Sequence, residues 1–283
     1  MSWTIARVLE WAAGDLRARS AASPRLDAEL LLAEVLACDR IRLVLERDRP
    51  LETAELAAYR ELHKRRRRGE PIAYLRGRRE FYSRSFVVDK RVLVPRPETE
   101  LLVDVALSRT QRLALAARVL DVCTGSGCVA ITIKKERPTN TVLAGDISAD
   151  ALEVARLNCE RLGAMVGLWQ SDLFSAFQGC SFDLVTANPP YVPDAEMTEL
   201  PADVRDFEPH MALAGGSDGL AVTRRLVADA PAYLARGGVA AVEVVAGAAR
   251  EVERLFAERG YEDVAIDRDL AGHERIVSAI WPK

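Results

Sequence analysis

The feature that most constrains the fold of this chain is an alternation, from residue 97 onward, between short apolar runs and longer amphipathic stretches. The apolar runs, rich in strand-forming residues, lie at residues 118–123, 141–148, 182–188, 237–245 and 275–281. Stretches with helical periodicity, such as "ADALEVARLNCERLG", lie between them. Strands that alternate with helices pair in parallel, so the pattern predicts an α/β domain whose sheet is covered by helices on both faces.

The first 75 residues predict a helical domain instead. In "SPRLDAELLLAEVLA", Ser23 can cap a helix, Pro24 suits its first turn, and apolar residues follow at helical spacing. A later helix in "LETAELAAYRELHKRRRR" is closed by a glycine. Residues 76–96 mix β-branched and aromatic residues with a turn at Gly77, which indicates a hairpin. We expect a partner-binding helical domain at 1–75, a hairpin linker at 76–96 and the α/β domain at 97–283.

Composition and charge exclude several classes of protein. The net charge of −3 argues against nucleic-acid binding driven by overall charge, and no run reaches the ~18 apolar residues of a membrane span. The five cysteines form no C-x-x-C pair and the three histidines are scattered, so we expect neither a metal site nor disulfides. We expect a cytoplasmic protein without a membrane partner. The run "HKRRRR" leaves an RNA-binding surface open, although such runs are usually solvated helix ends.

A glycine-containing turn follows the first apolar run of the α/β region. Gly125 and Gly127 lie between a strand and a helix, where a missing Cβ lets the backbone approach a ligand closely. Asp146 ends the next strand, where a carboxylate can accept hydrogen bonds from both ribose hydroxyls. Asp172 ends the third strand region and can accept from an adenine amino group. These residues predict a nucleoside-bearing cofactor, and both NAD and S-adenosylmethionine satisfy the pattern.

The residues after the fourth strand, Asn188-Pro189-Pro190-Tyr191, form an unusual strand end. The carbonyl of Asn188 and a backbone carbonyl near Pro189 can both accept from an NH₂ group, and Tyr191 offers a flat face. Ligands of parallel sheets bind at the carboxyl ends of the strands, so this corner should face the cofactor. We interpret it as a catalytic clamp for a planar amide or adenine, which holds the nitrogen against a methylsulfonium carbon.

At these residues the chain resembles the PrmC/HemK family, the glutamine-N5 methyltransferases of peptide chain release factors. The resemblance covers nearly the whole chain and rests on "SPRLDAELLLAEVL", "GEPIAYLRGRREFYS", "VLVPRPETE", "FDLVTANPPYV" and "FEPHMALAGGSDGL". It implies a Rossmann-like, seven-stranded methyltransferase domain behind a small helical bundle that grips the release factor. It also implies methyl transfer from S-adenosyl-L-methionine to the amide nitrogen of the glutamine in a Gly-Gly-Gln loop.

The resemblance also implies roles for individual residues. The substrate residues would be Arg96, Pro97, Glu98, Asn188, Pro189, Pro190 and Tyr191. The cofactor would lie on Asp121, Cys123, Thr124, Gly125, Ser126, Gly127, Asp146, Asp172, Leu173 and Asn188.

Two departures from the family pattern keep other hypotheses open. Cys123 stands where the family usually has glycine, and Val245 and Ala248 replace a glycine and a glutamine. These departures motivate a diverged paralogue without catalytic activity as one alternative. A nucleic-acid adenine-N6 methyltransferase, or another amide or amine N-methyltransferase, is a second alternative, since adenine also presents a planar NH₂ group.

Overall fold

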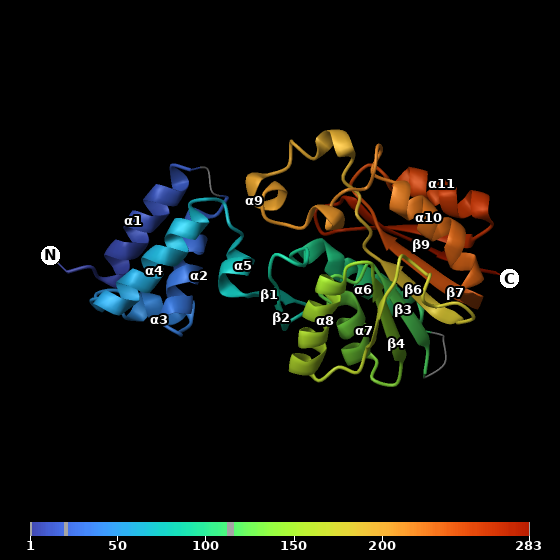
Figure 1. Cartoon of the computed structure of the whole chain (residues 1–283), viewed down its shortest axis with the longest axis horizontal. Helices are drawn as coiled ribbons and strands as arrows, with labels where there is room; N and C mark the ends of the chain where they lie inside the picture. The colour runs from blue at the N-terminus through green and yellow to red at the C-terminus, as the bar shows by residue number, and fades with distance from the viewer. Residues whose placement is uncertain (1, 20–21, 112–115, 283) are drawn as a thin grey trace. The chain divides into compact units, whose positions relative to one another are not determined.

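The computed structural model describes residues 2–19, 22–111 and 116–282, shown as ribbons in Figure 1. They form two compact units. The first, here the helical unit, comprises Met1–Arg78 and Pro201–Phe207, and the second, the sheet unit, comprises Arg79–Leu200 and Glu208–Lys283. A short segment from late in the chain therefore belongs with the N-terminal helices.

The helical unit packs amphipathic helices around one apolar core. These helices are α1 (Ile5–Arg17), α2 (Pro24–Val35), α3 (Arg40–Leu45), α4 (Thr53–Arg66) and α5 (Ile72–Arg76). A short helix, α9 (Ala202–Arg205), belongs to the same unit but has no buried residue. Leu31, Leu32 and Tyr59 are fully buried at the centre of this core. Pro24 opens α2 as predicted, whereas Ser23 makes no side-chain capping hydrogen bond. Within the described residues, no helix combines the length and apolar character that crossing a bilayer requires.

The basic run at the end of α4 is largely paired within the helical unit. Arg65 pairs with Glu70, Arg66 with Asp27 and Arg67 with Asp15. The Arg66–Asp27 pair is nearly buried, with side chains only 11% and 9% exposed, and Arg66 also donates to the carbonyls of Gly69 and Glu70. Because these cations already have carboxylate partners, the run is a poor candidate for a phosphate-binding surface.

The sheet unit contains a two-stranded hairpin and a seven-stranded sheet, which confirms the predicted fold class. The hairpin strands are β1 (Arg78–Phe81) and β2 (Arg84–Val87). Their turn lies at Tyr82 and Ser83, with φ of 50° and 58°, and not at Gly77, which closes α5 in a left-handed conformation. The predicted glycine turn was therefore wrong, because a glycine at a helix C-terminus and one in a hairpin look alike in a sequence.

Strand order in the large sheet is β5-β4-β3-β6-β7-β9-β8. Its strands are β3 (Arg118–Val122), β4 (Thr141–Asp146), β5 (Gly167–Gln170), β6 (Phe182–Ala187), β7 (Leu234–Glu243), β8 (Glu262–Arg268) and β9 (Glu274–Ile280). Strands β5, β4, β3, β6 and β7 pair in parallel, and β9 pairs antiparallel with both β7 and β8. The carboxyl ends of the parallel strands therefore meet at one edge.

Helices cover both faces of this sheet, as Figure 1 shows. They are α6 (Glu100–Arg109), α7 (Cys128–Glu136), α8 (Ala149–Leu162), α10 (Ala221–Asp229) and α11 (Ala249–Arg259). Along β3, Val119 packs in the core shared with α6 and α7, whereas Leu120 and Val122 pack in the core shared with α10 and α11. Both cores are apolar, which explains why the parallel strands are near-continuous apolar runs in the sequence.

Candidate active site

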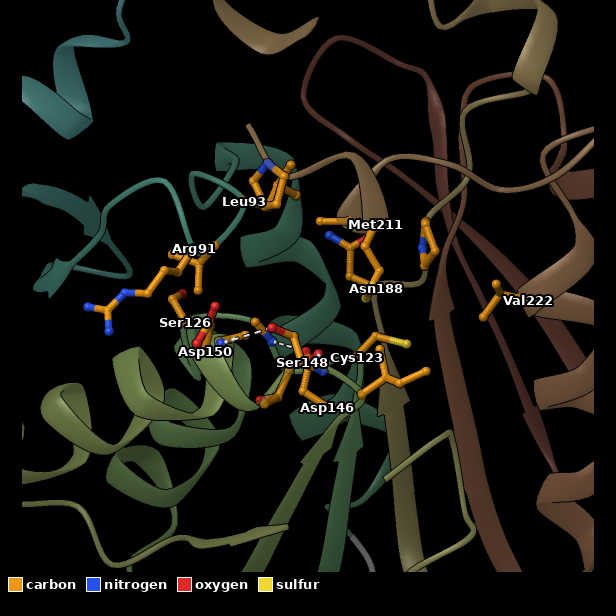
Figure 2. Close-up of a pocket in the computed structure, with 18 of the residues that line it drawn as sticks. Arg91, Leu93, Cys123, Ser126, Asp146, Ser148, Asp150, Asn188, Met211 and Val222 are labelled. Carbon is orange, nitrogen blue, oxygen red and sulfur yellow. Dashed lines mark hydrogen bonds between the residues drawn. The ribbon is translucent and has the colours of Figure 1, made fainter. Parts of the chain in front are cut away.

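A cavity of about 780 Å³ lies at the carboxyl ends of β3, β4 and β6. Figure 2 shows side chains from all three strand ends, with Cys123, Asp146 and Asn188 labelled among them. The predicted residues that line it are Arg96, Asp121, Cys123, Thr124, Gly125, Ser126, Asp146, Asp172, Leu173, Asn188 and Pro190. Pro97, Glu98, Gly127, Pro189 and Tyr191 do not line it. The cavity is large enough for a nucleoside-bearing cofactor and a substrate side chain.

Asp121, near the end of β3, is hydrogen-bonded to the glycine loop and holds it in place. Its side chain is buried and accepts hydrogen bonds from the hydroxyls of Thr124, at 2.6 Å, and Thr186, at 2.7 Å. Burial raises the pKa of Asp121 to about 6, although both hydroxyls oppose the shift. Because both carboxylate oxygens already bond within the protein, Asp121 joins the loop to β6.

The two loop glycines have different structural reasons. Gly125 has φ of 55°, and a Cβ there would meet no heavy atom within 4 Å, so its backbone borders open cavity space. Gly127 has φ of 78°, and a Cβ there would lie 3.0 Å from Cδ1 of Ile131 and 3.2 Å from Cβ of Ala155. Gly125 therefore suits close approach by a ligand, whereas Gly127 lets α7 and α8 pack together.

Cys123 adopts φ of 58°, a left-handed conformation that favours glycine. This explains why glycine is the usual residue at this position in the family pattern. The thiol lines the cavity, and burial raises its pKa, with Asp146 adding to the shift. The Cβ is accommodated at the cost of backbone strain, and the cavity beside it remains open.

Asp146 lines the cavity next to the glycine loop, and we call Gly125 and Asp146 together the cradle. Its two oxygens accept from the backbone N–H groups of Gly125, at 2.8 Å, and Ser148, at 2.9 Å, and Ser148 caps α8. Burial raises the pKa of Asp146, while these N–H groups favour its charged form. A carboxylate oxygen has more than one lone pair, so each can also accept from a ribose hydroxyl. This carboxylate and the open space at Gly125 fit the cofactor that the resemblance implies.

Asp172 and Leu173 also line the cavity. Asp172 is half exposed and accepts from Nη2 of Arg225 at 2.8 Å. Leu173 is buried with φ of 48°, so the backbone turns sharply after Asp172. Arg225 was not predicted as a site residue, because 53 residues separate it from its partner.

The Asn188 corner is fixed from two sides. Nδ2 of Asn188 donates to Oγ1 of Thr99 at 3.3 Å. The chain after Tyr191 pairs with a glycine-rich segment, because the carbonyl oxygen of Val192 accepts a hydrogen bond from the backbone N–H of Gly215 at 2.8 Å. A Cβ on Gly219 would lie only 2.4 Å from the Tyr191 carbonyl oxygen, so these backbones touch. Tyr191 is half buried and burial raises its pKa to about 12.

Arg96 is held by a buried carboxylate. Its Nη2 donates to Oε1 of Glu208 at 2.7 Å, and Oε2 of Glu208 accepts from Val94 N at 3.2 Å. Pro97 is exposed and Glu98 is half buried. Sequence reasoning missed Thr99, Met211 and other lining residues, although both lie within the quoted runs "RPETE" and "FEPHMALAGG". Only the resemblance marked those runs, since neither carries a local signal of its own.

Comparisons with known proteins agree with this geometry. The profile described as PrmC N-terminal domain matches residues 7–77, and the profile described as methyltransferase small domain matches residues 97–202. The release factor glutamine methyltransferase of Rhodopirellula baltica is 45% identical over 98% of this chain and 96% of its own length. That of Geobacter sulfurreducens is 42% identical over 97% of this chain and 96% of its own length.

The chain also resembles a solved methyltransferase structure in its fold. A methyltransferase from Pyrococcus furiosus is 18% identical, with a TM-score of 0.55, and covers 72% of this chain and 91% of its own. At this identity the likeness concerns the fold.

Proposed function

Because the chain belongs to the release factor glutamine methyltransferase family, we propose that its cavity methylates the side-chain amide nitrogen of the glutamine in a release factor's Gly-Gly-Gln loop. The methyl donor is S-adenosyl-L-methionine, and the chain is an enzyme of this class. The departures at Cys123, Val245 and Ala248 therefore do not mark it as a non-catalytic paralogue.

One observation carries the proposal: Asn188 lines the same cavity as Gly125 and Asp146. When bound, the cofactor supplies an electrophilic methyl group on a sulfonium. Asn188 contributes a carbonyl acceptor for the substrate NH₂ group, and the corner fixes its direction. An amide nitrogen is a weak nucleophile, so orientation of this kind supplies a large part of the rate.

The amide proton can leave after the new N–C bond has formed, because an N-methylated amide nitrogen that still carries all its protons is strongly acidic. The residues at the corner therefore need to orient the amide and accept hydrogen bonds. Strong basicity is not required of them.

The helical unit supports the second half of the proposal. We propose that residues 1–75 recognise the release factor, that 76–96 link them to the methyltransferase domain at 97–283, and that the enzyme acts in the cytoplasm. Trp11, Ile41 and Leu45 are exposed on this unit and offer apolar contact area for a protein partner.

The test is incubation of the enzyme with S-adenosylmethionine and two release factors, followed by mass spectrometry. We expect one methyl group on the loop glutamine and none on matched factors in which that glutamine is replaced by glutamate. A mixed RNA sample serves as the competing substrate. Methyl transfer to RNA alone, by a folded enzyme that binds the cofactor, would establish the adenine alternative instead.

A further inference from the structure

The strongest unexplained feature beside the site is a buried carboxylate, Glu243, at the end of β7. Its side chain is 3% exposed and it does not line the cavity. Strand register pairs Ala187 with Val242, so Asn188 and Glu243 follow adjacent positions on neighbouring strands. Within the described part of the chain, Oε2 of Glu243 has no hydrogen-bond partner. A buried, incompletely satisfied carboxylate is costly to keep and calls for a reason.

Thr99 lies between this carboxylate and the cavity. Its hydroxyl is buried and hydrogen-bonds to the Glu243 carboxylate, which opposes the increase in the pKa of Glu243 that burial causes. The same hydroxyl oxygen is 3.3 Å from Nδ2 of Asn188. Glu243, Thr99 and Asn188 thus form a hydrogen-bonded series from the core to the cavity, which we call the relay.

The number of available protons decides which group donates and which accepts in each hydrogen bond of the relay. Above the pKa of about 7 that burial gives Glu243, its carboxylate is ionised and only accepts hydrogen bonds, and a hydroxyl has one proton to donate. If Thr99 gives that proton to Glu243, its oxygen can only accept from Asn188. The NH₂ group of Asn188 must then face Thr99, and its carbonyl oxygen faces the other way.

We propose that Glu243 and Thr99 are positioning residues that hold the Asn188 carboxamide with its carbonyl oxygen, and not its NH₂ group, toward the substrate. This inference rests on the proposed function, because it gives a physical basis for choosing glutamine over glutamate. A carbonyl oxygen attracts the NH₂ group of glutamine and repels the carboxylate of glutamate. If the amide could turn, the NH₂ group would face the substrate and glutamate would be accepted.

The experiment measures binding of two release factors, one with its loop glutamine and one with glutamate there, to enzyme loaded with S-adenosylhomocysteine, at a pH well above 7 so that Glu243 is ionised. Thr99→Val is nearly isosteric and removes the hydroxyl. We expect it to lower the preference for glutamine about tenfold, the size of one oriented hydrogen bond, while cofactor affinity stays unchanged. Thr99→Ser keeps a hydroxyl and should restore most of the preference.

Glu243→Leu provides a second, independent variant. Without the carboxylate, the Thr99 hydroxyl is free to donate to Asn188, so the preference should fall as it does in Thr99→Val. The matched control is Thr132→Val on α7, since Thr132 is also fully buried and its hydroxyl has no partner among the described residues. This control should bind both factors as the wild type does.

An unchanged preference in folded Thr99→Val and Glu243→Leu would overturn the relay. A drop that is equal for both factors would also overturn it, because that is the result expected of a merely structural role. The readout is binding and not turnover, so the relay can fail while the wild type still methylates glutamine. Conversely, absence of methylation by the wild type counts against the proposed function alone.

Discussion

Contact between Gly219 and the Tyr191 carbonyl gives a prediction in which backbone strain and steric clash can be separated. Gly219 has φ of 76° and Gly179, an exposed glycine outside the cavity lining, has φ of 75°. Alanine at either position therefore meets the same left-handed strain of about 1–2 kcal/mol, partly offset because glycine loses more entropy on folding. A Cβ at Gly179 meets no heavy atom within 4 Å.

The two positions differ in what the new methyl group touches. At Gly219 it would lie 2.4 Å from the Tyr191 oxygen, and ordinary contact begins near 3.4 Å. One backbone must therefore retreat by roughly 1 Å, which costs about 1–3 kcal/mol, as overpacking generally does. The retreat moves the corner that holds the substrate amide, and a displacement of this size can lower the rate about a hundredfold.

We therefore expect Gly219→Ala to have a free energy of unfolding about 1–3 kcal/mol below that of Gly179→Ala, and a far lower turnover number. Affinity for S-adenosylmethionine should be similar in both, since Gly125 lies in the loop after β3 and Asp146 at the end of β4, both distant in sequence from the substituted glycines. Denaturant titration, calorimetry and a methylation assay measure the three quantities. Equal turnover in the two alanine variants would refute the claim that this backbone contact positions the corner.

Three further predictions follow from the same structure. Asn188→Ala should keep cofactor binding but lower turnover by about a hundredfold, as measured by methylation kinetics, and an unimpaired variant would contradict the clamp. Arg66→Met should destabilise the protein by about 3 kcal/mol because it leaves Asp27 buried without its cation, whereas Arg68→Met, at an exposed position, should have little effect in thermal denaturation. Burial raises the pKa of Glu243 from 4.5 to about 7, so the folded state holds this proton more tightly than the unfolded state. The free energy of unfolding of the wild type should therefore fall between about pH 4.5 and pH 7 by on the order of 3 kcal/mol more than that of Glu243→Gln, in denaturant titrations at several pH values.

The sequence was sufficient for the sheet wherever strands are buried on both faces. The runs at β3, β6 and β7 are apolar throughout because helices cover both sides of them, and this is visible without coordinates. The edge strand β8, "EDVAIDR", was missed because it is half exposed and carries charges at its ends. An exposed edge strand has no strong apolar pattern to detect.

For the site, residues at strand ends could be predicted and long-range pairs could not. Asp146 and Asn188 follow strands whose neighbours can be inferred, so their approach to one cavity was foreseeable. Arg96 and Glu208 are 112 residues apart, and no local pattern shows that they pair. Pro189 and Tyr191 were expected to face the substrate, yet neither lines the cavity: Pro189 is buried, and the Tyr191 backbone packs against Gly215 and Gly219.

The return of Pro201–Phe207 to the helical unit has a consequence for how this protein can be divided. The chain passes between the units three times, after Arg78, Leu200 and Phe207, so one cut does not separate them. A gene split after residue 78 would leave the Phe207 ring, which lies against Gly69, on the wrong polypeptide. Splitting the gene between the two units should therefore give folded products only where residues 201–207 are removed as well. The two units are thus expected to be inherited together.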